Sequence, residues 1–212
     1  MKIVLDFDDT IFNTHQMAQE FIKVFERNGF SEEEFYNAWK ICLKKIGKFD
    51  LDTVIDLIVN SNKSESLIKK KIKEKINLIL FNTDKFIYSD FFDFISGFEK
   101  NDLILLSFGE INFQRTKIEN SKIASFFVEV MITVKNKVEN LKLISKKHKN
   151  DKIFFIDDKA EQIDMVKKNL PQIITFKMER SQGEHVDVKS NLTDYIVKNL
   201  DEARVIINEL NK

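Results

Sequence analysis

Three short apolar runs, far apart in the chain, each stop abruptly at an acidic or hydroxyl residue. The runs, each with the polar residue that follows it, are 3–5 with Asp6, 103–106 with Ser107, and 153–156 with Asp157. Short apolar runs separated by long stretches of helical spacing are typical of the buried strands of a parallel sheet. Ligands of open α/β folds bind at the carboxyl edge of such a sheet. The sequence therefore predicts an α/β fold with a polar site at that edge.

The first of these runs leads into a dense group of oxygen-bearing side chains. Asp6, Asp8, Asp9 and Thr10 lie within five residues. An isolated buried charge is very costly, so such acids need a neutralising partner, and a hard cation such as Mg²⁺ prefers oxygen ligands. Strand alternation puts Asp6 and Asp8 on the same side of the chain, where two carboxylates can serve one substrate atom in different roles. The plain alternative is an Asp-rich turn after a strand.

The pattern Asp6-x-Asp8-x-Thr10 resembles motif I of the haloacid dehalogenase-like (HAD) hydrolases. The resemblance implies phosphoryl transfer through an aspartyl-phosphate intermediate. In that mechanism Asp6 would be the nucleophile, Asp8 the general acid/base and Thr10 a support for the loop.

The second run fits motif II of the same family. There Ser107 would hold the transferring phosphoryl group with its hydroxyl. The backbone of the next two residues, Phe108 and Gly109, would line the substrate site. Glycine at the second of these positions lets backbone N–H groups approach an anion closely.

The third run resembles motif IV, which implies the remaining carboxylate ligands of Mg²⁺. Asp158 is the first choice for direct coordination, and Asp157 would bind directly or through water. Asp6 and the backbone carbonyl of Asp8 would complete the protein ligands. Gln162 stands four residues after Asp158, where members of the family often carry a further acid, so that outer ligand is absent.

The family also requires one lysine, that of motif III, between the second and third runs. Lys135 and Lys137 are the candidates. We favour Lys137, because it opens the helix whose apolar positions are Val138, Leu141 and Ile144. A lysine at a helix N-terminus gains nothing from the helix dipole, so an anionic partner would account for its placement. An ordinary surface lysine is the rival interpretation.

Together the three runs, their motif residues and the motif III lysine predict a Rossmann-like core of three layers with an inserted helical cap. The core would comprise residues 1–14 and 86–212, and the cap residues 15–85, in the position of a C1 cap. Helical spacing predicts four cap helices, which begin near Thr14, Ser31, Asp50 or Asp52, and Ser64 or Ser66. The segment Ser31-Glu32-Glu33-Glu34 is a capping box. Strands are expected also at 127–133 and 173–177, and a last helix at 201–210.

Other polar and aromatic side chains are assigned to more ordinary roles. Gln114 and Lys117 are expected on a solvated helix face, and Arg180 on the surface. Tyr36 and Trp39 are expected to be buried inside the cap, and stacking on a substrate ring is their alternative role.

Composition excludes several classes of protein. Lys plus Arg and Asp plus Glu both number 34 in 212 residues, so no net field attracts nucleic acid or a membrane. The chain has a single Cys, which excludes an intramolecular disulfide framework. No apolar run approaches the ~20 residues of a membrane span, and no signal segment is expected because the first strand starts at once. We expect a cytoplasmic protein with a small-molecule substrate.

The resulting functional prediction is a Mg²⁺-dependent phosphomonoesterase that acts on a small phosphorylated metabolite. A phosphomutase acting on a sugar phosphate would use the same residues and would differ in how the cap excludes water. A phospho-accepting or Mg²⁺-binding regulator without turnover is the alternative outside enzymes. The oligomeric state and the substrate are left open.

Overall fold

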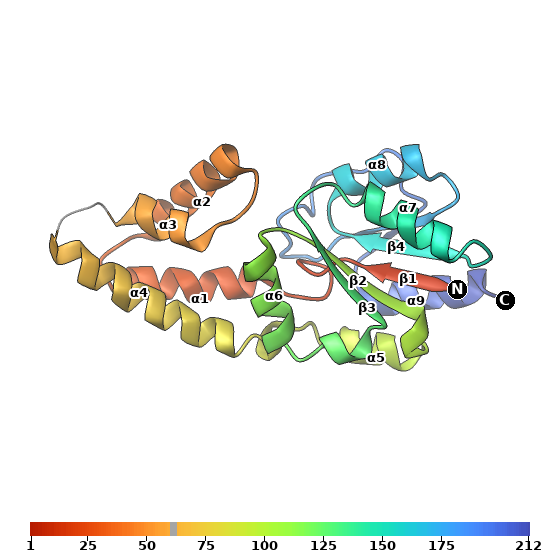
Figure 1. Ribbon diagram of the computed structural model, residues 1–212, viewed down its shortest axis with the longest axis horizontal. Coiled ribbons are helices and arrows are strands. Elements are labelled where there is room, and N and C mark those ends of the chain that lie inside the picture. Colours follow the sequence, from red (N-terminus) through yellow and green to blue (C-terminus); the bar gives the residue numbers. More distant parts are fainter. Residues whose placement is uncertain (60–62) are drawn as a thin grey trace.

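The computed structural model describes residues 1–59 and 63–212, and its centre is a parallel sheet (Figure 1). In the described residues six strands pair in the order β3-β2-β1-β4-β5-β6, each parallel to its neighbours. The strands are β1 (Lys2–Leu5), β2 (Leu103–Phe108), β3 (Glu129–Thr133), β4 (Ile153–Asp157), β5 (Ile174–Met178) and β6 (Tyr195–Val197). The central strands β1, β2 and β4 are buried on both faces, which is why they read as continuous apolar runs.

Helices cover both faces of this sheet. On one face, Val4 and Ile104 pack with α7 (Val138–Lys147) and α8 (Ala160–Asn169). On the other, Ile3 and Leu105 belong to the core that includes α5 (Asp90–Ser96) and α9 (Leu200–Leu210). Alternate residues of one strand thus serve opposite cores, as strand geometry requires. The three-layer α/β prediction is confirmed.

The helices α1 to α4 form a lobe at one end of the molecule, away from the sheet (Figure 1). They are α1 (Thr14–Glu26), α2 (Glu32–Ile46), α3 (Leu51–Ile58) and α4 (Lys63–Phe81). The predicted capping box is present, since Ser31 and Glu34 each bond the other's backbone N–H. The side chain that caps α1 is Asn13 and not Thr14, which is the first residue of the helix. The lobe is joined to the sheet layers by two connections, one before α1 and one after α4.

Short elements account for the remaining differences from the sequence prediction. The strand β6 was not predicted, because three residues are too few to show strand alternation. The helix α6 (Ile111–Asn120) is the one expected to carry Gln114 and Lys117. Three 3₁₀ turns of the described residues connect other elements: η1 (Asp84–Phe86), η2 (Lys100–Asp102) and η3 (Ala124–Phe126).

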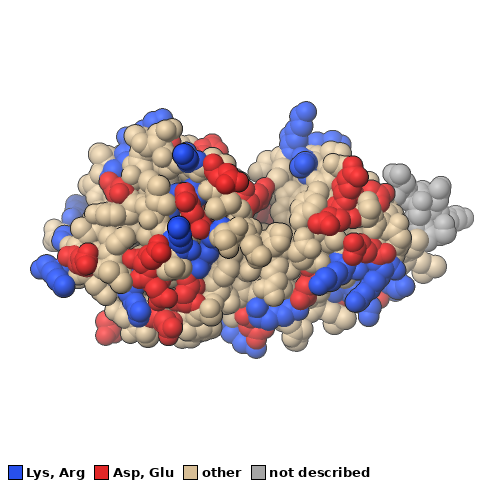
Figure 2. Space-filling model, turned by 180° about the vertical axis from the view of Figure 1, so that it is seen from behind, with Lys and Arg blue, Asp and Glu red and all other residues tan. Residues whose placement is uncertain are grey.

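The surface carries both signs of charge. In Figure 2 Lys and Arg side chains are interspersed with Asp and Glu over both lobes, and the surface is hollowed between the lobes. This distribution agrees with the balanced composition of the chain. Among the described helices, none is long and apolar enough to cross a membrane.

Candidate active site

The predicted motif residues meet at the carboxyl edge of the sheet. Asp6 follows β1, Ser107 lies near the end of β2, and Asp157 ends β4; all three are buried. Lys137 caps the start of α7, and its ammonium bonds Asp6 and also Asp157, the latter at 2.6 Å. Its side chain is 1 % exposed. The structure therefore brings together four residues that are up to about 150 positions apart in the chain, as parallel topology predicts.

Of the two candidate lysines, the structure places Lys137 at these acids. Lys135 is exposed, and it contacts Thr133 through its backbone. Burial alone would lower the pKa of Lys137, but the charges of Asp157 and Asp6 raise it above its ordinary value. The raised pKa favours the ammonium form of Lys137, between two acids at the centre of the site. Gln162 accepts a hydrogen bond of 3.0 Å from the Lys137 backbone N–H, so it helps to hold the start of α7 in place.

A group of three acids surrounds this lysine. One carboxylate oxygen from each of Asp6, Asp157 and Asp158 lies within 4.8 Å of the others. Burial raises the pKa of Asp6 to about 7, against the lowering effect of Lys137, and the charges of Asp157 and Asp8 add to the rise. Burial also raises the pKa of Asp158 well above its ordinary value, and Asp6 and Asp157 contribute. Within the described residues, Oδ1 of Asp158 is buried and has no hydrogen-bond partner.

These features fit a divalent cation. The acids repel one another at close range, and one buried carboxylate oxygen lacks a donor. Added positive charge would allow all three carboxylates to ionise together. An all-oxygen donor set is the chemistry that Mg²⁺ prefers.

Asp8 faces the same cavity, but its partners differ from those of Asp6. Its Oδ1 accepts from Thr14 Oγ1 at 3.0 Å and from Lys117 Nζ at 2.5 Å, and its Oδ2 accepts from Gln114 Nε2 at 2.6 Å. Burial alone would raise the pKa of Asp8, but the Lys117 ammonium and the hydrogen bonds from Lys117 and Gln114 lower it. Asp6 and Asp8 thus have opposite pKa shifts, and without a metal Asp8 is the more readily ionised of the two.

The prediction that Gln114 and Lys117 are solvated is wrong. Both lie on the inner side of α6 and are 2 % exposed. Gln114 Nε2 also donates to Ser107 Oγ at 2.7 Å and to the Phe108 carbonyl at 3.1 Å. The acceptor that the two residues share, Asp8, comes from a segment far away in the sequence, so their local pattern does not reveal the contact. The available signal was their i, i+3 spacing, which places both side chains on one helix face.

Arg180 is also buried, contrary to the surface position expected for it. Its guanidinium bonds both carboxylate oxygens of Asp90, at 2.6 and 3.0 Å, and donates to the carbonyl of Thr10 at 2.8 Å. The side chain of Thr10 is buried, and in the described part of the chain its hydroxyl has no partner. The Thr10 carbonyl is thus the group that Arg180 binds, and through it Arg180 fixes the loop that follows Asp6 and Asp8.

Asp9 shapes the same loop. Its backbone has φ 52°, the left-handed region that Asn and Asp tolerate better than other side chains. Its carboxylate accepts from the backbone N–H groups of Thr14 and Glu184, both at 3.2 Å. Burial raises the pKa of Asp9 to about 6, although these two hydrogen bonds lower it.

Asp9→Asn should leave the protein folded, because an amide suits the left-handed backbone and keeps one of the two oxygen acceptors, although its NH2 group replaces the other. A raised folded-state pKa means that Asp9 contributes most to stability when protonated. That contribution is lost as the pH rises from 3.8 toward about 6. Thermal unfolding measured without metal should therefore show that the stability of the Asn variant, relative to that of the parent, increases as the pH rises over this range. Asp9→Ala, which removes the acceptor and puts Ala in left-handed backbone, should cost about 1–2 kcal/mol. A difference in stability between the Asn variant and the parent that did not change over this pH range would contradict this explanation.

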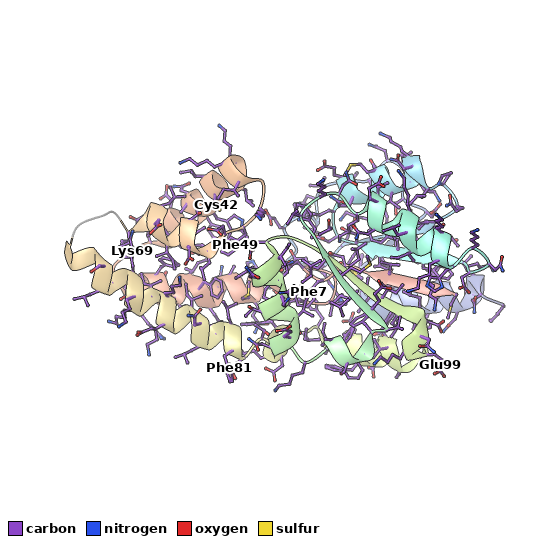
Figure 3. All side chains as sticks on the ribbon, in the orientation of Figure 1. Phe7, Cys42, Phe49, Lys69, Phe81 and Glu99 are labelled. Carbon is purple, nitrogen blue, oxygen red and sulfur yellow. The ribbon has the colours of Figure 1, made fainter. Side chains whose placement is uncertain are left out.

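A cavity of about 510 Å³ lies beside the acids, between the sheet edge and the helical lobe. Lys48 and Phe49 line it from the lobe, and Lys117, Asp158 and Lys159 line it from the sheet side. The Phe49 side chain lies on the side of the lobe that is nearest to α6 (Figure 3). Its ring contacts that of Phe113 of α6, with 5.1 Å between the ring centroids. The two lobes therefore close around one cavity.

Lys159 supplies a further positive charge to this cavity. Burial alone would lower its pKa, but the carboxylates of Asp158, Asp6 and Asp157 raise it. Its Nζ lies 5.2 Å from the centroid of the Phe108 ring. An ammonium at this position would attract an anionic substrate. Sequence reasoning missed Lys159, although it directly follows Asp158 and precedes the first residue of α8, where the helix dipole favours anions over cations.

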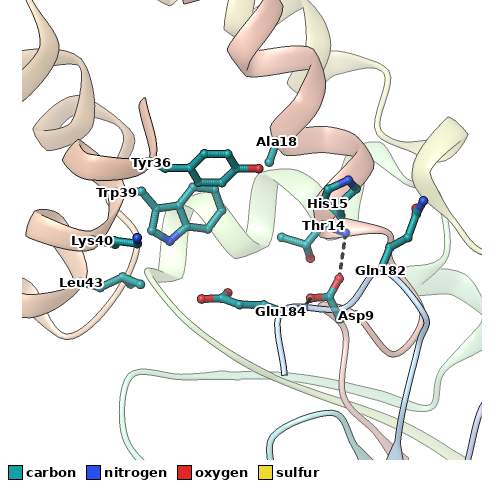
Figure 4. Close-up of a pocket in the computed structure, with 10 residues that line it drawn as sticks. All are labelled: Asp9, Thr14, His15, Ala18, Tyr36, Trp39, Lys40, Leu43, Gln182 and Glu184. Carbon is teal, nitrogen blue, oxygen red and sulfur yellow. Dashed lines mark hydrogen bonds between the residues drawn. The ribbon is translucent and has the colours of Figure 1, made fainter. Parts of the chain in front are cut away.

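A second pocket of about 290 Å³ adjoins the cavity, with Trp39, Leu43 and Glu184 lining both. Tyr36 and Trp39 present their rings to it from α2, opposite Glu184 of the loop after β5 (Figure 4). Both rings are half-buried. The expectation that they are buried inside the lobe is therefore only partly correct, because each also contributes to a pocket wall.

Comparison with known proteins places the fold. No protein-family model matches the sequence, and no curated protein does. Solved structures do resemble it. A haloacid dehalogenase-like hydrolase from Burkholderia xenovorans LB400 has a TM-score of 0.74 at 14% identity, covering 95% of this chain and 96% of that one. The HAD-hydrolase YfnB from Bacillus subtilis, bound to magnesium, has a TM-score of 0.66 at 16% identity, covering 98% of each chain. L-2-haloacid dehalogenase from Xanthobacter autotrophicus has a TM-score of 0.62 at 10% identity, again covering 98% of each. The chain therefore has the Rossmann-like fold of HAD-like hydrolases.

Proposed function

We propose that the protein is a Mg²⁺-dependent phosphomonoesterase that forms an aspartyl-phosphate on Asp6. The observation that carries the proposal is the contact of Lys137 with Asp6 and Asp157 at the sheet edge, beside buried Ser107. An acid, a hydroxyl and a fixed cation around one cavity suit a phosphoryl group, because catalysis of its transfer is chiefly positioning and charge stabilisation. The fold shared with HAD-like hydrolases supports the same proposal.

Asp6, Asp157, Asp158 and the backbone carbonyl of Asp8 are the residues we assign to Mg²⁺. The unpartnered oxygen of Asp158 supports the assignment, as does the magnesium bound by the similar hydrolase from Bacillus subtilis. When bound, the ion would neutralise charge on the phosphoryl oxygens.

The chain's own residues carry the chemistry. Asp6 attacks phosphorus in line, while Lys137 and the Ser107 hydroxyl stabilise charge on the phosphoryl oxygens. Asp8 gives a proton to the leaving oxygen as the P–O bond breaks. It then takes a proton from the water that attacks the aspartyl-phosphate. The backbone at Phe108 and Gly109 and the Thr10 loop line the substrate site.

A hydrolytic dehalogenase is the competing activity, because L-2-haloacid dehalogenases share the fold. Asp8 favours the phosphatase: the dehalogenase branch lacks this second acid, and a halide leaves without a proton. A phosphomutase would transfer the phosphoryl group to a second hydroxyl of the sugar phosphate, and a regulator would stop after one phosphoryl transfer.

One experiment separates the phosphatase from the dehalogenase and the regulator. The purified protein is incubated with Mg²⁺ and a panel of phosphorylated metabolites, and in parallel with 2-haloacids. We expect many phosphates released per chain, no release of halide and no release of phosphate in excess chelator. Halide release without phosphate release would assign the dehalogenase activity, and a single phosphate per chain would indicate a regulator.

The metal assignment makes its own prediction. Asp158→Ala should raise the Mg²⁺ concentration for half-maximal activity by at least about tenfold, because it removes a carboxylate ligand. Asp164→Ala is the matched control, since the Asp164 carboxylate bonds Ser190 and the following backbone and not the acid cluster. Equal shifts for the two variants in a Mg²⁺ titration of activity would show that Asp158 is not a ligand.

We further propose that residues 15–85 are a cap that selects the substrate through the pocket beside Trp39. Trp39→Ala should raise KM for the preferred ester by about tenfold or more, on the scale of one buried aromatic contact. Hydrolysis of p-nitrophenyl phosphate should change much less. Trp39 also packs against Phe35 and Phe49, so thermal unfolding must show that α2 stays folded. An unchanged ranking of esters in a folded variant would place selectivity outside this pocket.

A further inference from the structure

Lys117 occupies an unusual position for a lysine. It is 2 % exposed, and its Nζ lies 5.1 to 5.3 Å from the ring centroids of Phe7, Phe12 and Phe113. Within the described residues, its side-chain partner is the carboxylate of Asp8, at 2.5 Å. Taking an ammonium and a carboxylate out of water is costly even when they are paired, and replacing both by apolar residues of similar volume would often be at least as stable. Stability alone therefore does not explain a lysine here.

Gln114 joins Asp8 to a second site residue. Its Nε2 lies 2.6 Å from Asp8 Oδ2 and 2.7 Å from Ser107 Oγ. Because Gln114 donates to the Ser107 oxygen, the hydroxyl hydrogen of Ser107 is free to point toward another acceptor. Gly109 makes room for this amide, since a Cβ at position 109 would lie 2.8 Å from Gln114 Cγ.

Together these contacts hold the Asp8 carboxylate from two sides. Thr14, at the start of α1, and Lys117 both donate to Oδ1, while Gln114 donates to Oδ2. Lys117 and Gln114 lie three residues apart on one face of α6, so a single helix fixes both oxygens. The Asp8 side chain is still 25% exposed, toward the cavity that Lys117 and Gln114 also line.

We propose that Lys117 and Gln114 are positioning residues that hold the Asp8 carboxyl group against the leaving oxygen of the substrate. The proposal rests on the acid–base role given to Asp8 by the proposed function. In the step concerned, the P–O bond breaks, its electron pair stays on the leaving oxygen, and the proton moves from Asp8 to that oxygen. Neither Lys117 nor Gln114 changes its own bonds. Their contribution is orientation, which matters most where proton transfer is most needed.

If Lys117 acts by orienting Asp8, its removal should lower kcat by an amount that depends on the leaving group. Lys117→Met removes the charge and keeps an unbranched side chain. For an alkyl phosphate ester, whose alcohol leaves poorly without a proton, kcat should fall about a hundredfold, the lower end of general acid–base effects. For p-nitrophenyl phosphate, whose phenolate leaves unaided, kcat should fall less than about tenfold on the same basis. KM and the calorimetric affinity for Mg²⁺ should stay nearly constant.

Lys122→Met is the matched control. Lys122 follows the same helix, but it is 77% exposed and pairs with Asp84 at the surface. This variant should match the parent with both esters. An equal loss of kcat for both esters in Lys117→Met would overturn the proposal, because a merely structural lysine affects all substrates alike.

A second variant covers the case in which Lys117→Met does not fold. The double variant Asp8→Asn with Lys117→Met leaves neither an unpaired carboxylate nor an unpaired ammonium, so it avoids the cost of a broken ion pair. If Lys117 acts through Asp8, the double variant should be no slower than Asp8→Asn alone, as expected for residues that act as a unit. If kcat of the double variant were more than about tenfold below that of Asp8→Asn, Lys117 would act independently of Asp8 and the proposal would be overturned.

Failure of the proposed function gives a different result. If the unaltered protein hydrolyses no phosphate ester, the phosphatase proposal falls. The pairing is then tested by thermal unfolding of the two single variants and the double variant, without substrate. Non-additive changes in melting temperature would support a coupling between Lys117 and Asp8, and fully additive changes would overturn that coupling.

Discussion

Asp6→Asn should lower phosphate turnover by at least about a thousandfold, the scale of losing a covalent nucleophile. The amide keeps the shape of the side chain but cannot attack phosphorus. The fold should survive, because Lys137 retains its contact with Asp157 and the buried acid group loses one of its mutually repelling charges. Turnover with saturating Mg²⁺ and thermal unfolding are measured side by side.

Asp93→Asn is the control for this substitution, since Asp93 is exposed on α5. It should keep parental turnover. A pure, folded Asp6→Asn protein that releases phosphate at a near-parental rate would rule out Asp6 as the nucleophile.

Lys137→Met should affect both activity and stability. Removing the ammonium leaves Asp6 and Asp157 buried without their cation, and breaking one side of a buried ion pair costs about 3–5 kcal/mol. Activity should fall at least about a hundredfold, since a fixed positive charge on the phosphoryl group is lost. Added Mg²⁺ should raise the melting temperature of this variant more than that of the parent, because the ion replaces part of the missing charge.

Lys135→Met tests the same assignment by removing the other candidate lysine. Lys135 is exposed at the wall of the cavity and contacts none of the described acids, so its loss should change stability little and turnover much less than the loss of Lys137. The reverse result, with Lys135→Met inactive and Lys137→Met near normal, would show that the wrong lysine was assigned.

Much of the sheet could be predicted from sequence, because its central strands carry a clear signal. β1, β2 and β4 are buried on both faces, so they appear as apolar runs with defined ends. Their parallel arrangement then brings Asp6, Ser107 and Asp157 to one edge. The short strand β6 at the rim carries no such pattern and was missed.

The contacts of the polar side chains were harder to predict. Lys117 and Asp8 are 109 positions apart, and Arg180 and Thr10 are 170 apart. A buried lysine or arginine has the same local pattern as a solvated one, because its partner is supplied by another segment. The tertiary fold alone determines which of these cations face inward. The division into core and cap and the roles of the site residues remain predictions.

The most direct test of the central claim is a search for the phosphoryl group on Asp6 during turnover. The protein is mixed with Mg²⁺ and its preferred ester, quenched in acid within milliseconds, and analysed by intact mass and peptide mapping. The account predicts one added phosphoryl group per chain, on the peptide that contains Asp6, and none in Asp6→Asn or in excess chelator. Rapid turnover of the same sample with no phosphorylated protein, or with the label on another residue, would contradict it.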